Sequence, residues 1–194
     1  MSSFNLGKTK VTFQYIYVAV LVTVLVLDKN GGIFCCFLAS FFHEIGHLIA
    51  LICLKQRVDE VRFTVFDIQI RSSHYLDFKR EIIITLSGVA FNFLLSIFFY
   101  RIIPLFSLAN LFIGIFNILP VSTLDGGQAI NLFFCRFISP KKSVIIINVL
   151  TVIVSIPIFT FGIIILLNTK YNFSFLLLGV YLILTVVNNK EIIL

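Results

Sequence analysis

Two histidines and a glutamate lie close together in the stretch His43-Glu44-Ile45-Gly46-His47. On an α-helix, positions i and i+4 lie about 40° apart around the axis and about 6 Å apart along it, so the two imidazoles can bind one metal ion. Glu44 is about 100° round from His43, where its carboxylate can reach a metal-bound water. The pattern His-Glu-x-x-His combines two neutral nitrogen ligands with a carboxylate general base. The alternative is a pair of buried histidines that are hydrogen-bonded to their neighbours.

This stretch lies inside an apolar run, Gly31–Leu54. Ionisable groups at membrane depth cost several kcal/mol and usually mark a functional site. Three such groups on one apolar segment therefore favour a metal site over a pair of structural histidines.

A tetrahedral catalytic zinc needs a third protein ligand besides its water. His74 is the only other histidine, and it lies in a polar segment, so we interpret it as a solvated surface residue. Asp125 is the better candidate, because it ends an apolar stretch and is followed by two glycines that let the backbone turn. Asp125 can also be the N-cap of a short helix over Gln128–Phe137, and the two roles do not exclude each other.

The composition indicates the surroundings of these residues. Hydrophobic residues make up 59% of the 194 residues and charged residues only 12%, whereas a soluble domain is about 45–50% apolar and about 25% charged. This balance excludes an ordinary soluble enzyme, a disordered chain and a nucleic-acid module. The four cysteines form no CxxC pair and are interpreted as buried thiols.

The sequence therefore predicts an α-helical polytopic membrane protein with about six transmembrane helices. A spanning helix needs about 20 apolar residues, and the fourth run is short because Pro120 stops it. The first run has no A-x-A-like exit, so no cleavable signal peptide is expected. The six apolar runs are Val11–Leu27, Gly31–Leu54, Ile82–Ile103, Leu105–Leu119, Val144–Leu167 and Tyr171–Val187.

The distribution of basic residues predicts the orientation. With six spans, all of the 15 lysines and arginines except Lys29, Arg101 and Lys170 fall on one side of the membrane. Basic residues concentrate in cytoplasmic loops, so both termini and the loop Lys55–Arg80 are predicted to be cytoplasmic. The direction of the second and fourth spans then brings the His-Glu-x-x-His stretch and Asp125 to the cytoplasmic side.

The polar segment Lys55–Arg80 carries a strand signal. Within it, Val58–Arg71 is rich in β-branched and aromatic residues, and apolar positions alternate with polar ones. The alternation changes phase near Phe66–Asp67, which predicts a bulge or a short β-hairpin after the second span.

The motifs together resemble those of the site-2 protease family of intramembrane zinc metalloproteases. His43-Glu44-x-x-His47 matches the first motif, and the stretch from Asn117 through Gly126 matches the family's N-x-x-P-x-x-x-L-D-G pattern. Ser87–Asn92 is similar to its G-P-x-x-N element, and the resemblance runs from about Phe34 to Gln128.

The resemblance implies a role for each matching residue. It implies that His43, His47 and Asp125 bind zinc and that Glu44 activates water. It also implies that Asn117, and with it Asn92, binds the substrate. On this basis residues 1–194 form a single membrane-embedded metalloprotease domain, in which 34–128 hold the core motifs, 55–80 the cytoplasmic β segment and 143–194 accessory transmembrane helices.

The chain looks most like the minimal branch of the family that lacks PDZ and CBS domains and includes a sporulation protease. The resemblance implies hydrolysis of a peptide bond in or near a transmembrane segment of a membrane-tethered substrate, with release of a transcription factor as one outcome. The implied partners are a single-span or membrane-associated protein, the lipid bilayer and regulatory membrane proteins, without nucleic acid. The implied location is the bacterial cell membrane, and a bias toward Ile, Phe, Asn and Lys suits an AT-rich bacterial genome.

A rival hypothesis is a small transporter or metal carrier that uses the same His and Asp residues. Transporters often show paired repeats and discontinuous helices in both halves, whereas no partner motif is visible in the fifth and sixth runs. Glu44 also has no obvious task in a plain carrier. A second rival, an inactive relative that only binds membrane helices, is disfavoured by the intact His-Glu-x-x-His pattern.

Overall fold

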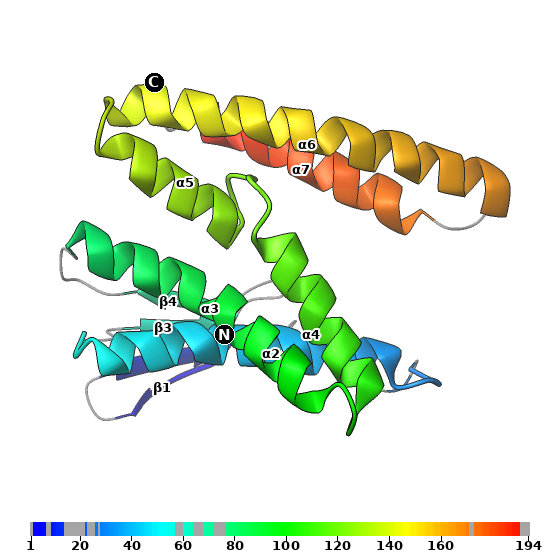
Figure 1. Cartoon of the computed structure of the whole chain (residues 1–194), viewed down its shortest axis with the longest axis horizontal. Coiled ribbons are helices and arrows are strands. Elements are labelled where there is room, and N and C mark those ends of the chain that lie inside the picture. Colours follow the sequence, from blue (N-terminus) through cyan, green and yellow to red (C-terminus); the bar gives the residue numbers. More distant parts are fainter. Residues whose placement is uncertain are drawn as a thin grey trace. The chain divides into compact units, whose positions relative to one another are not determined.

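The computed structural model describes residues 2–6, 9–13, 22, 26, 28–56, 60–63, 68–71, 77–170 and 173–190. These residues form mainly helices together with one small sheet (Figure 1). The chain divides into two compact units, Met1–Ile115 and Phe116–Leu194. The helices are α2 (Gly32–Cys53), α3 (Phe78–Phe99), α4 (Pro104–Asn117), α5 (Asp125–Cys135), α6 (Pro140–Thr169) and α7 (Ser174–Lys190).

In the first unit, α2 packs against α3, and α4 covers both at one end. Phe106 of α4 is buried between two rings in edge-to-face contact, Phe42 of α2 and Phe99 of α3, with ring centroids 5.9 and 5.5 Å away. Ala39 and Ala109 are also buried here and allow the three helices to approach closely. This core fixes the three helices that carry the His-Glu-x-x-His stretch and its surroundings.

The sheet of the first unit has the strand order β1-β2-β3-β4, with β1 at Ser2–Leu6, β2 at Thr9–Phe13, β3 at Glu60–Phe63 and β4 at Ile68–Arg71. Strands β1 and β2 are antiparallel, β2 and β3 are parallel, and β3 and β4 are antiparallel. Parallel strands cannot be joined by a tight turn, and the connection from β2 to β3 includes α2.

Two sequence predictions bear on this sheet. The first apolar run was predicted to begin at Val11, but residues 11–13 belong to β2, because their backbone pairs with β3. The antiparallel pair β3–β4 lies in the segment where strands were predicted. Residues 64–67, where the hairpin turn was predicted, lie outside the described residues, so the turn stays a prediction.

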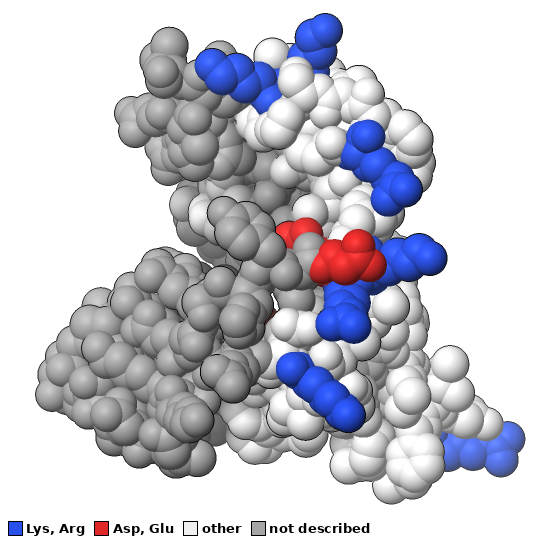
Figure 2. Space-filling view, turned by 90° about the vertical axis from the view of Figure 1, so that its left-hand side faces the viewer, with Lys and Arg blue, Asp and Glu red and all other residues white. Residues whose placement is uncertain are grey.

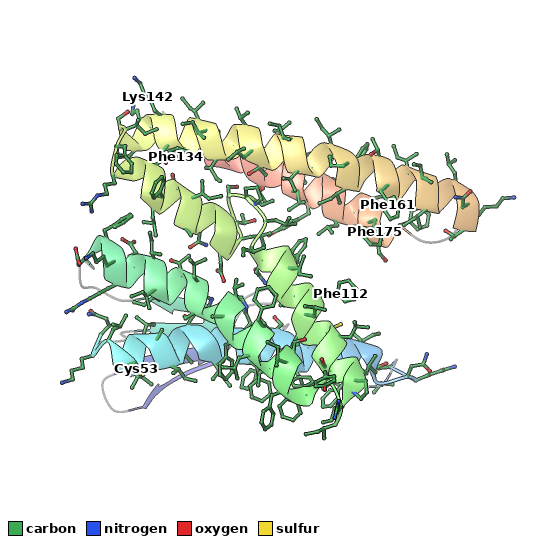
Figure 3. All side chains as sticks on the ribbon, in the orientation of Figure 1. Cys53, Phe112, Phe134, Lys142, Phe161 and Phe175 are labelled. Atoms are coloured by element: carbon green, nitrogen blue, oxygen red, sulfur yellow. The ribbon has the colours of Figure 1, made fainter. Side chains whose placement is uncertain are left out.

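In the second unit, α6 and α7 run side by side (Figure 1). Two glycines allow this close packing, because a Cβ at Gly162 would lie 2.6 Å from the backbone nitrogen of Leu176 and one at Gly179 would lie 3.0 Å from Phe159 Cα. Small residues serve the same purpose in many membrane helix pairs. Phe161 and Phe175 extend the contact edge-to-face, with ring centroids 5.8 Å apart (Figure 3).

Within the described residues, α2, α3 and α6 are long and apolar enough to cross a membrane. Their outward side chains are largely apolar. On the described part of the face in Figure 2, acidic and basic side chains gather in one central group, other basic side chains are scattered, and the remainder is uncharged. The three helices match the second, third and fifth predicted runs. By contrast, α4 has 14 residues and is about 21 Å long, which is short of the roughly 30 Å hydrocarbon core.

Candidate metal centre

Helix α2 presents His43 and His47 to α3. His43 is buried, with 4% of its surface exposed, and His47 is half-buried. Between them, Gly46 faces α3, where a Cβ would lie 2.8 Å from Phe91 Cβ and 2.9 Å from the Ser87 carbonyl oxygen. The glycine of this stretch therefore lets the two helices approach closely at the level of the imidazoles.

Both histidines direct Nδ1 at an oxygen atom supplied by α3. His43 Nδ1 lies 2.5 Å from Asn92 Oδ1, and His47 Nδ1 lies 2.7 Å from the carbonyl oxygen of Ile84. A carbonyl oxygen can only accept a hydrogen bond, so in each ring Nδ1 donates and carries the proton. The lone pair of each neutral imidazole is then on Nε2.

The two Nε2 atoms lie 3.2 Å apart. Two lone pairs at this distance repel each other unless a cation or a proton lies between them. Two nitrogen ligands at 2.0–2.1 Å from a tetrahedral zinc would be about 3.3–3.4 Å apart. The imidazole pair therefore has the spacing and the tautomers of a shared metal site.

Gly88 of α3 borders the same space. A Cβ at this position would lie 2.5 Å from His47 Nε2 and 2.7 Å from His43 Nε2. Any larger residue would put a methyl group where an ion bound by both nitrogens belongs. A metal ion thus fits the donor atoms and the glycine opposite them.

Three α3 residues on one face of the helix supply the two oxygen acceptors and the space opposite the imidazoles. Ile84, Gly88 and Asn92 follow one another at intervals of four, so they lie along one face of the helix. Ile84 provides a carbonyl oxygen, Gly88 the space, and Asn92 an amide oxygen. The sequence element Ser87–Asn92 therefore builds the wall opposite His43 and His47.

Glu44 is half-buried on α2, next to His43 in the chain. Its role as a general base stays a prediction.

In the second unit, Asp125 is the first residue of α5, and Leu124 occupies the N-cap position with an extended backbone. The alternative prediction that Asp125 caps a helix is therefore wrong, because α5 begins at Asp125 itself, one residue earlier than a capping aspartate would require. An acidic side chain in the first turn still interacts favourably with the helix dipole.

The glycines after Asp125 serve close packing rather than a turn. Both are buried within α5, and neither has a positive φ. A Cβ at Gly126 would collide with the Ile118 carbonyl group, and one at Gly127 would collide with that of Val121. The prediction that these glycines let the chain turn is corrected accordingly: they let the preceding loop lie directly on the first turn of α5.

The loop before Asp125 is also held by α6. The Ser122 backbone N–H donates to Thr151 Oγ1 over 3.0 Å, and Val121 is fully buried. Asn117, the predicted substrate-binding residue, is the last residue of α4 and is half-buried. The second unit thus positions Asn117 and Asp125 at the two ends of one anchored loop.

Asn92 differs from the prediction in its surroundings. Its side chain is fully buried, and its amide group is hydrogen-bonded to His43, to the Ala39 carbonyl oxygen and to Asn110. These contacts favour a role inside the protein over contact with a substrate. The sequence analysis did not predict a role for Asn110, although an asparagine in the middle of the apolar run Leu105–Leu119 is a signal that could have indicated one. His74 lies outside the described residues.

Comparison with known proteins identifies a solved structure with a similar fold. No model of a known protein family matches the sequence, and no curated protein matches it. Among solved structures, the chain is similar to the site-2 protease from Methanocaldococcus jannaschii, with a TM-score of 0.69 and 16% sequence identity. The match covers 97% of this chain and 95% of that one.

The chain has the fold of a site-2 protease. The resemblance stated from the motifs is therefore confirmed by the arrangement of the backbone over nearly the whole chain. The apolar helices and this fold indicate an integral membrane protein.

Proposed function

We propose that this chain is an intramembrane zinc metalloprotease that hydrolyses a peptide bond in or near a transmembrane segment of a membrane-tethered protein. The observation that carries the proposal is the pair of Nε2 atoms 3.2 Å apart on an apolar helix, with both Nδ1 atoms engaged by oxygen acceptors. Glu44 lies beside this pair in the chain, and the site-2 protease fold supports the same reading.

The proposed ligands are His43, His47 and Asp125, the three residues that the sequence motifs predict. Asp125 would complete the three protein ligands that a catalytic zinc requires. The two units would then act as a single membrane-embedded domain. When bound, zinc would serve as a Lewis acid that polarises the scissile carbonyl and supports a water nucleophile at neutral pH.

Glu44 is the proposed general base. Its carboxylate takes a proton from the water whose oxygen attacks the scissile carbonyl carbon. When the carbon–nitrogen bond breaks, the same carboxyl group gives that proton to the leaving amine nitrogen. Asn117 would hold the unwound substrate, since an amide side chain both donates and accepts hydrogen bonds.

The sheet offers a second contact for an unwound substrate. Among the described strands, β4 pairs only with β3 and so forms one edge of the sheet. An extended peptide can add to such an edge through backbone hydrogen bonds. The alternative is that this segment only covers the site.

The orientation remains that predicted from the basic residues, with both termini and the active site toward the cytoplasm of a bacterial cell. The parallel pairing of β2 with β3 agrees with the part of this prediction that puts residues 9–13 and 60–63 on the same side of the membrane, whichever side that is. The proposed substrates are single-span proteins, including tethered transcription factors, whose cleavage frees a soluble part.

Glu44→Gln tests the function, because it keeps the size of the side chain and removes the base. The purified variant should retain about one zinc per chain, as the wild type should, and should cleave a single-span substrate at least about a hundredfold more slowly. Glu81→Gln, the same change in the first turn of α3, is the matched control and should cleave normally. Wild-type cleavage by Glu44→Gln, or a wild type that transports metal without cleaving, would refute the proposal.

A further inference from the structure

A chain of buried amides leads away from His43 into the contact between α3 and α4. Asn92 Nδ2 donates to the carbonyl oxygen of Ala39 over 3.0 Å and to Asn110 Oδ1 over 2.9 Å. Asn110 Nδ2 in turn donates to the Phe106 carbonyl oxygen over 2.9 Å. Both asparagine side chains are fully buried.

The ends of this chain fix the direction of every hydrogen bond in it. The carbonyl oxygens of Ala39 and Phe106 can only accept, so the nitrogen of each amide must face them. Asn110 then presents its oxygen to Asn92, and Asn92 presents its oxygen to His43 Nδ1. Turning either amide over would bring two acceptors, or two donors, together in a buried place, which costs about 1–3 kcal/mol.

The fixed orientation of the Asn92 amide determines the tautomer of the His43 imidazole. Because Asn92 Oδ1 accepts, His43 must carry its proton on Nδ1 and its lone pair on Nε2, which faces His47 Nε2. In many metal sites the ring nitrogen that does not bind the metal donates to an oxygen acceptor, and this bond sets the tautomer and the ring orientation.

We propose that Asn92 and Asn110 are positioning residues that hold His43 as the Nδ1–H tautomer with Nε2 directed at the metal. The inference rests on the proposed function and deepens it. It replaces substrate binding as the role of Asn92, and it gives a task to Asn110.

Three variants separate this role from simple filling of space. Asn92→Leu keeps most of the volume and removes the acceptor, and it should weaken zinc binding by about 10–100-fold. Asn92→Asp keeps an oxygen for His43 Nδ1–H, so its zinc affinity should exceed that of Asn92→Leu. A purely structural role predicts the opposite order, because the aspartate would place an acceptor against Ala39 and Asn110. Asn110→Leu should weaken zinc binding less than Asn92→Leu, since the bond to Ala39 still holds the Asn92 amide.

Ser107→Ala is the matched control. Ser107 lies on α4 one turn before Asn110, is buried, and donates to the Ser96 carbonyl oxygen of α3 over 2.7 Å. The Ser107→Ala variant therefore loses a buried hydrogen bond between the same two helices, while the hydrogen bonds that lead from Asn110 through Asn92 to His43 stay intact. Its zinc affinity, measured by competition with a chelator, should equal that of the wild type.

The tautomer itself can be read without any variant of the asparagines. In the ¹⁵N-histidine-labelled full chain, the His43 signals are those missing from His43→Ala, and the one-bond proton coupling should appear on Nδ1. A proton on Nε2 of His43 would overturn the inference, as would an Asn92→Leu protein that folds and binds zinc like the wild type. Asn110→Leu behaving like Ser107→Ala would remove Asn110 from it. A wild type without zinc or cleavage would instead refute the proposed function, because the tautomer is measured independently of both.

Discussion

The imidazoles of His43 and His47 are brought together by helix geometry, but their chemistry is set by the atoms opposite them. An imidazole can present either nitrogen, and the acceptors at Nδ1 select Nε2 in both rings. Since the same helix face of α3 supplies both acceptors and the glycine between them, the spacing of three α3 residues determines the donor set.

Gly88→Ala is predicted to abolish zinc binding. The added methyl group would lie 2.5 and 2.7 Å from the two Nε2 atoms, in the volume that a shared ion requires. Metal content of the purified variant should fall well below one per chain while α2 and α3 still pack, as judged by circular dichroism and gel filtration.

Gly114→Ala is the control for that substitution. The three atoms nearest to a Cβ there are side-chain atoms, at 3.1 Å for Phe93 Cε1 and 3.4 Å for Asn92 Cβ, so small side-chain movements can accommodate it. This variant should retain its zinc. Equal zinc content in Gly88→Ala and the wild type would place the ion somewhere other than between the two Nε2 atoms.

At the scale of elements, the backbone of the loop between α4 and α5 packs directly against the backbone of the first turn of α5. The Val121 carbonyl lies where a Cβ of Gly127 would be, and neither group can move as a side-chain end can. Gly127→Ala should therefore destabilise the fold by at least about 1–3 kcal/mol, the usual cost of overpacking. Thermal unfolding in detergent measures this effect.

Gly32→Ala provides the comparison for the loop. Gly32 is in the first turn of α2, and a Cβ there would meet nothing within 4 Å. Replacing a helical glycine by alanine then stabilises by about 0.5–1 kcal/mol. If Gly127→Ala unfolded at the wild-type temperature, the loop would have to be able to move away from α5.

Strand β4 is the element on which the proposed substrate pairing depends. Alternate residues of Ile68–Arg71 direct their N–H groups toward β3 and away from it. Proline at each of the four positions in turn removes one donor, so the outward-facing pair of variants tests substrate pairing alone. These variants should bind zinc normally and cleave more slowly; normal cleavage by all of them would leave β4 as a cover.

At the scale of the whole molecule, the membrane topology determines which side of the membrane the metal site faces. Basic residues favour the cytoplasmic side, and the β2–β3 pairing keeps residues 9–13 and 60–63 on one side of the membrane. Reporter fusions after Arg71 and after Lys142 should therefore both be cytoplasmic. A reporter after Lys170 should lie outside, which makes it the internal control of the series.

A fusion after Arg71 that reported the external side would contradict the prediction that the metal site lies toward the cytoplasmic side. The strand pairing would still hold in that case, so the N-terminal strand would have to be external as well. With an external fusion after Arg71, an external N-terminus would therefore indicate an inverted protein, and a cytoplasmic N-terminus would indicate an error in the β2–β3 pairing.

The sequence by itself determined what depends on neighbours along the chain. The pairing of His43 with His47 follows from the helix period, and the membrane helices α2, α3 and α6 follow from the length and apolarity of their runs. Strands in the segment that contains β3 and β4 follow from its alternating pattern.

Only the tertiary structure decided the contacts that join distant residues. Asn110 meets Asn92 from another helix, Gly88 faces two imidazoles of α2, and β2 pairs with β3 across almost fifty residues of chain. Periodicity specifies which face of an element is apolar, but not which atom of another element lies against it. The same limit applies to the two glycines after Asp125. A glycine can be required either for a turn or for the close approach of two backbone segments, and the sequence does not distinguish these reasons. The packed backbone shows that these two glycines permit close approach.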